Sequence, residues 1–323
     1  MRRIGRILSN LMLTLLIAIV ATWASLALWY RLPAQELCRD LIGSLVILIG
    51  VGTIIALYSR FRRPALICFI TAFSIDLIWW ATIKPADHAD WASDVARQVT
   101  GTLNGDTLTL TNVRNFEWRS DQDFTARWTS RTYDLTKLRT LDLFLSYWSG
   151  AEIAHTIMSF GFEGGEFLAW SIEVRRLKGG EYSPVADLFK TNPLVIIAAD
   201  ERDVIRLRTN IRREDVQLFR LRAPPEKARP LLLEYVSDAN ALVGSPRFYN
   251  SITTNCTTTI VKMMRVVGES MPLNWRFIAN GYLPDYAYQR GALDKRSSLS
   301  ELKEFAHIDK RAELYQRPRI LTH

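Results

Sequence analysis

The chain is poor in residues that bind metal ions or form disulfide bonds. Its 323 residues include three cysteines and four histidines, with no CxxC and no HExxH motif. No Cys/His cluster has the spacing of metal ligands, so we expect no metal site and no cofactor. Two of the cysteines, Cys38 and Cys68, lie in or between apolar runs near the N-terminus. Cys256 stands alone in the later part, which excludes a disulfide bond within that part.

A basic surface stripe of the kind that binds nucleic acid is also missing. The net charge is +8 and the pI is about 9.5, yet the positive charges alternate with Asp and Glu, and several arginines flank apolar segments. We therefore expect no nucleic-acid partner, and interpret the excess charge as attraction to an anionic membrane surface. Internal repeats and low-complexity tracts are absent too.

Long apolar runs are present, and all of them lie within the first 83 residues. They are Ile7–Trp29, Leu41–Tyr58 and Leu66–Ile83. A helix of about 18 residues or more can cross the roughly 30 Å of hydrocarbon in a bilayer. The first run could instead be a cleaved signal peptide, but no clear small-residue cleavage site follows it and two further runs do. We predict three transmembrane helices in a region spanning residues 1–84.

The arginines around these runs predict their orientation. Three precede the first run and three lie between the second and third, and cytoplasmic loops carry such an excess (Arg2, Arg3, Arg6, Arg60, Arg62 and Arg63). Three crossings then place everything after Ile83 outside the cytoplasm, which predicts a multi-pass protein of a bacterial inner membrane with its C-terminal domain in the periplasm. Asp76, inside the third run, is either a functional acid or one that faces the other helices or snorkels.

The remainder of the sequence is typical of a soluble α+β domain. Short β-prone runs come first, and two segments with helical spacing follow, at Pro225–Leu242 and Cys256–Val267. The order of an antiparallel sheet followed by helices predicts the α+β class. The expected strands are Thr102–Leu103, Thr107–Thr111, Phe124–Tyr133, Thr140–Trp148, Ile153–Phe162, Phe167–Arg175, Leu194–Ala198, Val204–Arg208 and Val216–Leu221.

The expected boundaries follow from these patterns. A juxtamembrane linker covers residues 85–110, with a short helix at Ala86–Gln98. The folded domain covers residues 111–290, with a tight hairpin turn at Gly164–Gly165. A polar tail covers residues 291–323, and Asp294–Glu304 within it is expected to be a solvated helix or irregular.

Cys256 lies where the second soluble helix is predicted to begin. Thr254 or Asn255 is a good N-cap, and the helical pattern starts directly after it. The unpaired N–H groups and positive dipole end of a helix favour a thiolate, which is the nucleophilic form of cysteine. The alternative is a small buried thiol beneath a helix cap, because free cysteine is among the most buried residue types.

His155 is the candidate base for this thiol. It lies in a strand-like run, whereas His88 is juxtamembrane and His307 and His323 lie in the polar tail. A core histidine satisfied by hydrogen bonds is the alternative. A Cys–His pair also needs a group that orients the imidazole, and Glu173 on the hairpin partner is our candidate. Glu163, an asparagine or a backbone carbonyl would serve equally.

The arrangement of these residues resembles the circularly permuted branch of the papain-like fold, in which the His-bearing sheet precedes the Cys-bearing helix. The lecithin–retinol acyltransferase group belongs to that branch, and its motif also begins Asn-Cys. A closer resemblance is to the family of the N-terminal periplasmic domain of the bacterial lipoprotein N-acyltransferase Lnb. The segments that carry it are 112–116, 142–148, 154–156, 159–162, 171–173, 200–206, 248–250 and 255–258.

This resemblance implies a Cys–His acyl-transfer centre at Cys256 and His155. It implies a membrane-anchored acyltransferase that moves an acyl chain from phospholipid to a lipoprotein amine through a thioester. We expect Asn255, Thr257 and Arg202 to contribute to substrate binding. Arg202, Arg206 and Arg208 could contact lipid phosphates, although charges on a solvated face are the favoured interpretation of these three. In this chain the membrane helices precede the domain, whereas in the named acyltransferase they follow it, so the resemblance bears on the chemistry more than on the substrate. A cysteine amidase or peptidase acting on cell-wall peptides and a non-enzymatic membrane scaffold are the alternatives.

Overall fold

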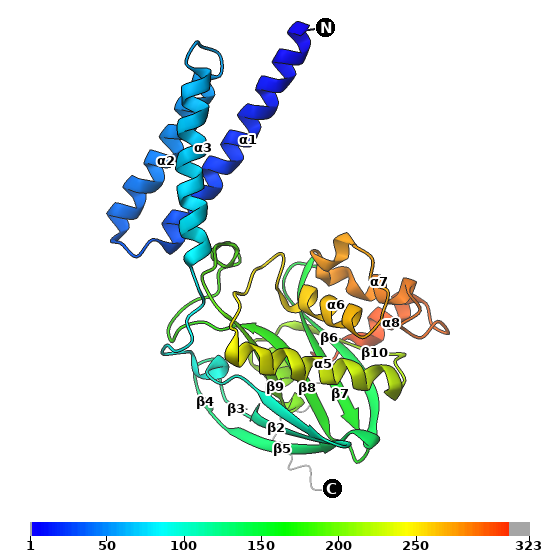
Figure 1. The fold of residues 1–323 in the computed structure, drawn as a ribbon. Coiled ribbons are helices and arrows are strands. Elements are labelled where there is room, and N and C mark those ends of the chain that lie inside the picture. The colour runs from blue at the N-terminus through cyan, green and yellow to red at the C-terminus, as the bar shows by residue number, and fades with distance from the viewer. Residues whose placement is uncertain (1, 310–323) are drawn as a thin grey trace. The chain divides into compact units, whose positions relative to one another are not determined.

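A computed structural model describes residues 2–309, and their contacts divide the chain into two units. The first unit, called here the anchor, comprises residues 2–85 with the loop 183–191. The second, called here the soluble domain, comprises residues 86–182 and 192–309. Each is described by itself, and Figure 1 labels their helices and strands.

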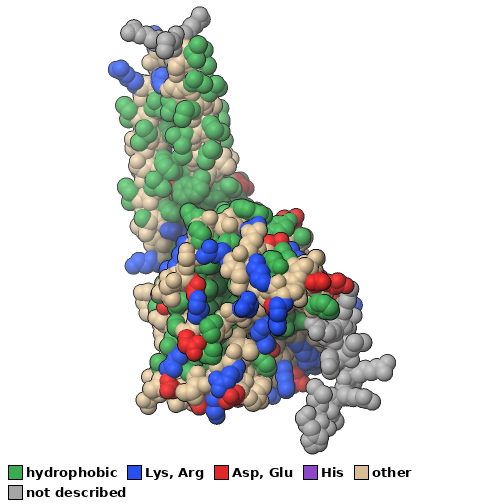
Figure 2. All heavy atoms as spheres, turned by 90° about the vertical axis from the view of Figure 1, so that its right-hand side faces the viewer, with side chains coloured by type: hydrophobic (Ala, Val, Ile, Leu, Met, Phe, Trp, Pro, Cys, Tyr) green, Lys and Arg blue, Asp and Glu red, His purple; other side chains and the backbone are tan. Residues whose placement is uncertain are grey.

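The anchor contains three helices long and apolar enough to cross a membrane. They are α1 (Arg2–Arg31), α2 (Glu36–Ala56) and α3 (Arg62–Thr82). Small residues such as Ala24 and Ala27 are buried between them, while most large aliphatic side chains point outward; apolar side chains cover the visible face of these helices in Figure 2. Packing small residues inside and exposing large apolar ones is the distribution that lipid favours.

Two features of the anchor go beyond its apolar surface. The carboxylate of Asp76 is buried against the other helices, and neither of its oxygens has a hydrogen-bond partner among residues 2–309. In the loop 183–191, the Phe189 ring stacks on Tyr30 at 5.2 Å, and Lys190 Nζ donates to the Trp80 carbonyl at 2.8 Å. These contacts, together with the short turn Ala186–Phe189, tie the loop to the helices.

The soluble domain is built on one large sheet with the strand order β1-β2-β9-β8-β7-β6-β10, and β5 pairs with β2. Every pairing is antiparallel except that of β2 with β9. The strands are β1 (Thr100–Asn104), β2 (Thr107–Arg114), β5 (Trp128–Asp134), β6 (Leu138–Ser149), β7 (Ile153–Phe162), β8 (Phe167–Val174), β9 (Leu194–Ala199) and β10 (Asp215–Leu221). A separate two-stranded sheet joins β3 (Glu117–Trp118) to β4 (Phe124–Thr125).

Helices α5 (Pro225–Gly244) and α6 (Cys256–Val266) pack on one face of this sheet (Figure 1). Trp170 of β8 is fully buried, and its ring lies 5.2 Å from that of Tyr235 of α5. The opposite face is covered in part by α4 (Glu201–Arg206), where Val204 packs against Ile157 and Val195. The central strands are therefore buried on both faces, which explains their nearly continuous apolar sequences. The predicted α+β class, with a sheet preceding the helices, is confirmed.

Shorter elements complete the domain. Helices α7 (Leu283–Gln289) and α8 (Leu299–Ala306) follow α6. Single turns occur at Leu135–Lys137, Trp275–Phe277 and Asn280–Tyr282, and a π-helical turn covers Leu207–Ile211. Gly164 and Gly165, both with positive φ, make the tight turn expected between β7 and β8.

Several sequence-based expectations differ from these elements. Val204–Arg208 is not a strand. Asp200 accepts a hydrogen bond from the Arg202 amide and so caps α4, and the β-branched residues Val204 and Ile205 are buried by the packing of this helix. Ala86–Gln98 contains only the turn Ser93–Val95. The sheet begins at Thr100, inside the expected linker. Within the expected tail, α8 packs through Ala306, and residues 310–323, with His323, lie outside the described part.

Candidate active site

The start of α6 is fixed by a capping box centred on Asn255. Its Oδ1 accepts hydrogen bonds from the amides of Thr257 and Thr258 at 3.0 and 2.8 Å, and its own amide donates to Thr258 Oγ1 at 2.9 Å. The Thr259 amide donates to the Asn255 carbonyl. The Cys256 amide is thus the first-turn N–H group that has no hydrogen-bond partner within residues 2–309.

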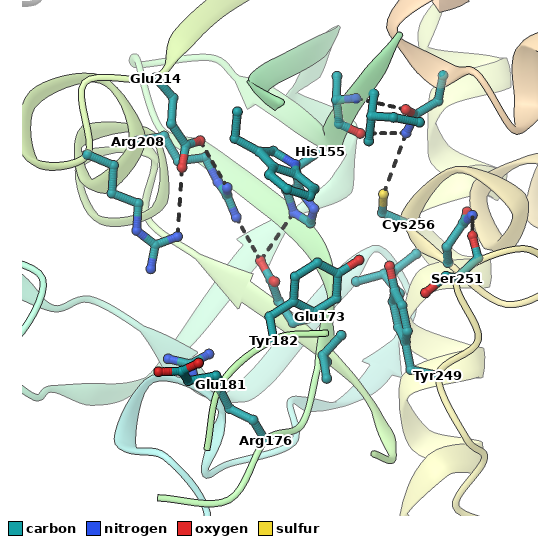
Figure 3. A pocket seen from close by; sticks show the side chains of 18 of the residues that line it. His155, Glu173, Arg176, Glu181, Tyr182, Arg208, Glu214, Tyr249, Ser251 and Cys256 are labelled. Atoms are coloured by element: carbon teal, nitrogen blue, oxygen red, sulfur yellow. Dashed lines mark hydrogen bonds and ion pairs between the residues drawn. The ribbon is translucent and has the colours of Figure 1, made fainter. Parts of the chain in front are cut away.

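Cys256 and His155 line the same cavity, of about 470 Å³ (Figure 3). Cys256 is the first residue of α6 and is only 4% exposed, while His155 comes from the beginning of β7. Burial alone would raise the pKa of the thiol, but the charge of His155 and hydrogen bonds from it more than offset burial and lower the thiol pKa. This environment favours a thiolate paired with an imidazolium.

The imidazole of His155 is held from its other side by β8. Its Nε2 lies 2.7 Å from Ser171 Oγ and 3.2 Å from Glu173 Oε1, and Ser171 Oγ donates to Glu173 at 2.6 Å. Since Ser171 donates its proton to the carboxylate, Nε2 carries the hydrogen in this network. Nδ1 is then the nitrogen available to the thiol.

The charges around His155 set its protonation. Burial and Arg208 both lower its pKa, whereas the charges of Glu173 and Cys256 raise it, and the net result is a pKa of about 9. Burial would raise the pKa of Glu173, but His155 and Arg208 hold that pKa well below its usual range. An ionised carboxylate therefore faces a protonated imidazole, as in a catalytic triad.

Arg208 is a functional candidate that sequence reasoning placed only among possible phosphate-binding arginines. Its guanidinium is buried and lies 3.2 Å from both Glu173 and Glu214, so that it bridges the two carboxylates (Figure 3). Arg208 sits in the π-helical turn after α4. No local pattern signals that a π turn will aim this side chain at β8.

Asn280 is a second residue that the sequence did not reveal. Its side chain hydrogen-bonds the backbone of Ala154 and donates to Thr257 Oγ1 at 2.7 Å, and its Nδ2 lies 3.9 Å from Cys256 Sγ. It thereby links the strand that bears the histidine to the helix that bears the cysteine. The signal in the sequence was the turn-forming pair Asn280-Gly281, and in the structure an added Cβ on Gly281 would meet the Ala151 carbonyl oxygen at 2.0 Å.

The expected substrate-binding residues lie in different places. Asn255 lines the cavity, but its side chain serves as the helix cap. Thr257 is buried, and its hydroxyl lies 2.9 Å from that of Thr156 in the wall behind Cys256. Arg202 is exposed on α4 and does not line the cavity, since the side of α4 that packs inward carries Asp203 and Val204.

One group of side chains within residues 2–309 is close enough to share a metal ion. It comprises Asp215, His307 and Asp309, none of which lines the cavity. His307 Nδ1 lies 2.7 Å from Asp215 Oδ1, so this group forms an ion pair when His307 is protonated. Nothing further in the group indicates a metal centre.

Comparison with protein families gives one finding. Residues 124–281 match the sequence model described as the Lnb N-terminal periplasmic domain, in agreement with the resemblance inferred from the motifs. The matched region runs from β4 to the turn that contains Asn280, and so includes Cys256, His155 and Glu173. Searches of curated proteins and of solved structures returned no significant match.

Proposed function

Because residues 124–281 match the model of the Lnb N-terminal periplasmic domain, and three helices of the chain are long and apolar enough to cross a membrane, we propose that the chain is a thiol-dependent acyltransferase. It would move an acyl chain from a phospholipid to a lipoprotein amine through a thioester on Cys256. The observation that carries this proposal is that Cys256 and His155 line one cavity, with Glu173 3.2 Å behind the imidazole. We further propose that the anchor crosses a bacterial inner membrane three times, with the N-terminus inside.

The first half-reaction acylates the enzyme. His155 Nδ1 holds the proton of Cys256, and the thiolate attacks an ester carbonyl carbon of the phospholipid. A C–S bond forms, the ester C–O bond breaks, and the lysophospholipid alcohol leaves with the proton from the imidazolium. Glu173 stabilises the imidazolium throughout and keeps the ring oriented.

The second half-reaction transfers the chain. The amine attacks the thioester carbon and His155 takes the proton of the amine. The C–S bond then breaks, and the product is an amide with Cys256 restored as a thiolate beside the protonated imidazole. The acceptor and donor would both reside at the membrane surface, which suits a catalytic domain attached to membrane helices.

The oxyanion of each tetrahedral intermediate needs hydrogen-bond donors. The N–H groups at the start of α6 are the candidates for this role. The capping box engages those of Thr257 and Thr258, so we assign the Cys256 amide as the donor from the helix. A second donor would have to come from another part of the cavity or from the substrate.

Mass spectrometry of the intact full-length protein, purified and supplied with phospholipid, tests the proposal. We expect an added acyl mass that hydroxylamine removes, because thioesters react with it. The Cys256→Ser variant should lack this thioester, whereas Cys38→Ser and Cys68→Ser, which alter cysteines of the anchor, should retain it. Wild-type protein that acquires no acyl mass would contradict the proposal.

A specific feature of the cavity favours one alternative. Three arginines and three glutamates contribute to its lining, which would also suit a polar peptide (Arg176, Arg208, Arg212, Glu173, Glu181 and Glu214). A cysteine amidase or peptidase acting on cell-wall peptides would use the same pair of residues. Release of peptide from purified muropeptides, without any acyl adduct, would identify that activity. A non-enzymatic scaffold would instead leave His155→Ala cells indistinguishable from wild type.

A further inference from the structure

A second cavity lies behind the catalytic pair, between α6, α7 and the sheet. Its volume is about 260 Å³. Its lining includes Thr156 and Thr257, whose hydroxyls are 2.9 Å apart. The residues next to these two threonines, His155 and Cys256, line the first cavity instead. The two cavities are therefore separate spaces on the two sides of one hydrogen-bonded pair.

The interior of the second cavity is apolar. Its buried lining consists mainly of aliphatic side chains and methionine, with one tyrosine (Leu141, Leu143, Met158, Leu231, Ile260 and Tyr286). Methionines Met264 and Met271 contribute from half-buried positions, and flexible methionine side chains adapt to apolar ligands. Because an apolar cavity of about 150 Å³ holds benzene, this one has room for about ten carbon atoms.

The exposed lining is charged, and mostly positive. Arg222, Lys227 and Arg290 are exposed residues that line the cavity, whereas the acidic residue among the lining, Glu269, is paired with Lys227 at 2.7 Å. Figure 2 faces the side of the soluble domain that carries α7 and α8, and Lys and Arg side chains are numerous there. An apolar interior with a cationic rim complements a molecule with one apolar chain and an anionic end.

We propose that this cavity binds a medium-chain fatty acid, with its chain against α6 and its carboxylate at the rim beside Arg222. The site is distinct from the catalytic cavity and requires no chemistry at Cys256. Its occupant would contact Thr257, the residue after the nucleophile. The domain would thereby hold a free fatty acid next to its reactive centre.

Photolabelling of the full-length protein in phosphatidylcholine nanodiscs tests this site. The probe is decanoic acid with a diazirine near its methyl end, and labelled peptides are mapped by mass spectrometry. We expect saturable labelling of peptides from α6 and α7, displaced by decanoate but not by its uncharged methyl ester. The Cys256→Ser variant should label equally, so failure of the acyltransferase proposal would leave this result unaffected.

Two variants and a control sharpen the test. Ala287→Trp should fill the cavity and abolish saturable labelling. Arg222→Glu alters an exposed residue and should weaken binding by about fivefold, since an exposed ion pair contributes up to about 1 kcal/mol. Arg202→Glu makes the same change outside both cavities and should have no effect.

Three results would overturn the proposal. The first is labelling of α6 and α7 that does not saturate. The second is equal displacement by decanoate and its methyl ester, which would exclude recognition of an anionic end. The third is stronger displacement by lysophosphatidylcholine than by decanoate, which would make a lysophospholipid the occupant.

Discussion

The side-chain amide of Asn280 hydrogen-bonds both the N–H and the C=O of Ala154, the residue that precedes His155. Asn240 of α5 does the same to Gly101 of β1, at 2.9 and 2.8 Å, and neither residue lines the cavity that contains Cys256. These two asparagines hold a strand in the same way, but only Asn280 also contacts the Cys-bearing helix. They form a matched pair for mutation.

Asn280→Ala should reduce thioester formation by about tenfold or more, because it frees both the strand and Thr257. The loss of buried hydrogen bonds should also lower the free energy of unfolding by about 1–3 kcal/mol. Asn240→Ala should cost less stability and leave thioester formation unchanged. Equal losses of thioester formation in the two variants would show that Asn280 acts only through stability.

Glu173→Gln should move the alkaline limit of thioester formation to lower pH. The carboxylate raises the pKa of His155, which is about 9, and the reaction needs the protonated imidazole to release the alcohol. Removing the negative charge lowers this pKa, so activity is lost earlier as the pH rises. The pH profile of acylation measures the shift, and Glu181→Gln, which alters another acid of the same cavity, should leave the profile in place.

Arg208→Met should move that limit in the opposite direction. Arg208 lowers the pKa of His155, so its removal extends the reaction to higher pH. It also leaves Glu173 and Glu214 without their shared cation, at a cost of about 3 kcal/mol in the free energy of unfolding. Arg208→Lys retains the charge and should keep the wild-type limit, which separates the electrostatic effect from lost folding. An alkaline limit that falls in Arg208→Met would refute the assignment.

Asn255→Asp should raise the thiol pKa while preserving the helix cap. Aspartate accepts the same amide hydrogen bonds, but its negative charge next to Cys256 disfavours the thiolate. Asn255→Ala should instead cost about 1 kcal/mol of stability. The pH dependence of Cys256 alkylation reports the thiol pKa. Ser298→Ala removes the cap of α8 and should lower stability without changing that alkylation profile.

Much of this architecture could be predicted from local patterns. The three apolar runs gave three membrane-length helices, and Asn255 at the start of a helical pattern gave the capped helix that bears Cys256. Both inferences depend on neighbouring residues alone. The alternation of apolar residues likewise identified β6, β7 and β8, because hairpin-linked strands follow each other directly along the chain.

The remaining features depend on long-range packing. Ile157 and Cys256 belong to separate hydrophobic clusters. His155 lies two residues before Ile157, so its side chain is on the same side of β7 as that of Ile157. The imidazole and thiol therefore meet only at the end of the strand, which periodicity does not reveal. Asn280 and Arg208 reach the site from an irregular turn and a π turn. Val204–Arg208 was wrongly expected to be a strand because its β-branched residues are buried by helical packing.

The parallel pairing of β2 with β9 has a consequence for how the domain folds. Arg114 of β2 pairs with Ala199 of β9, whereas β6, β7 and β8 form a meander of adjacent hairpins. Loop closure over a long stretch is slower than hairpin formation. The meander should consequently nucleate folding, and the edge formed by β1, β2 and β5 should join last, once β9 has paired with β8.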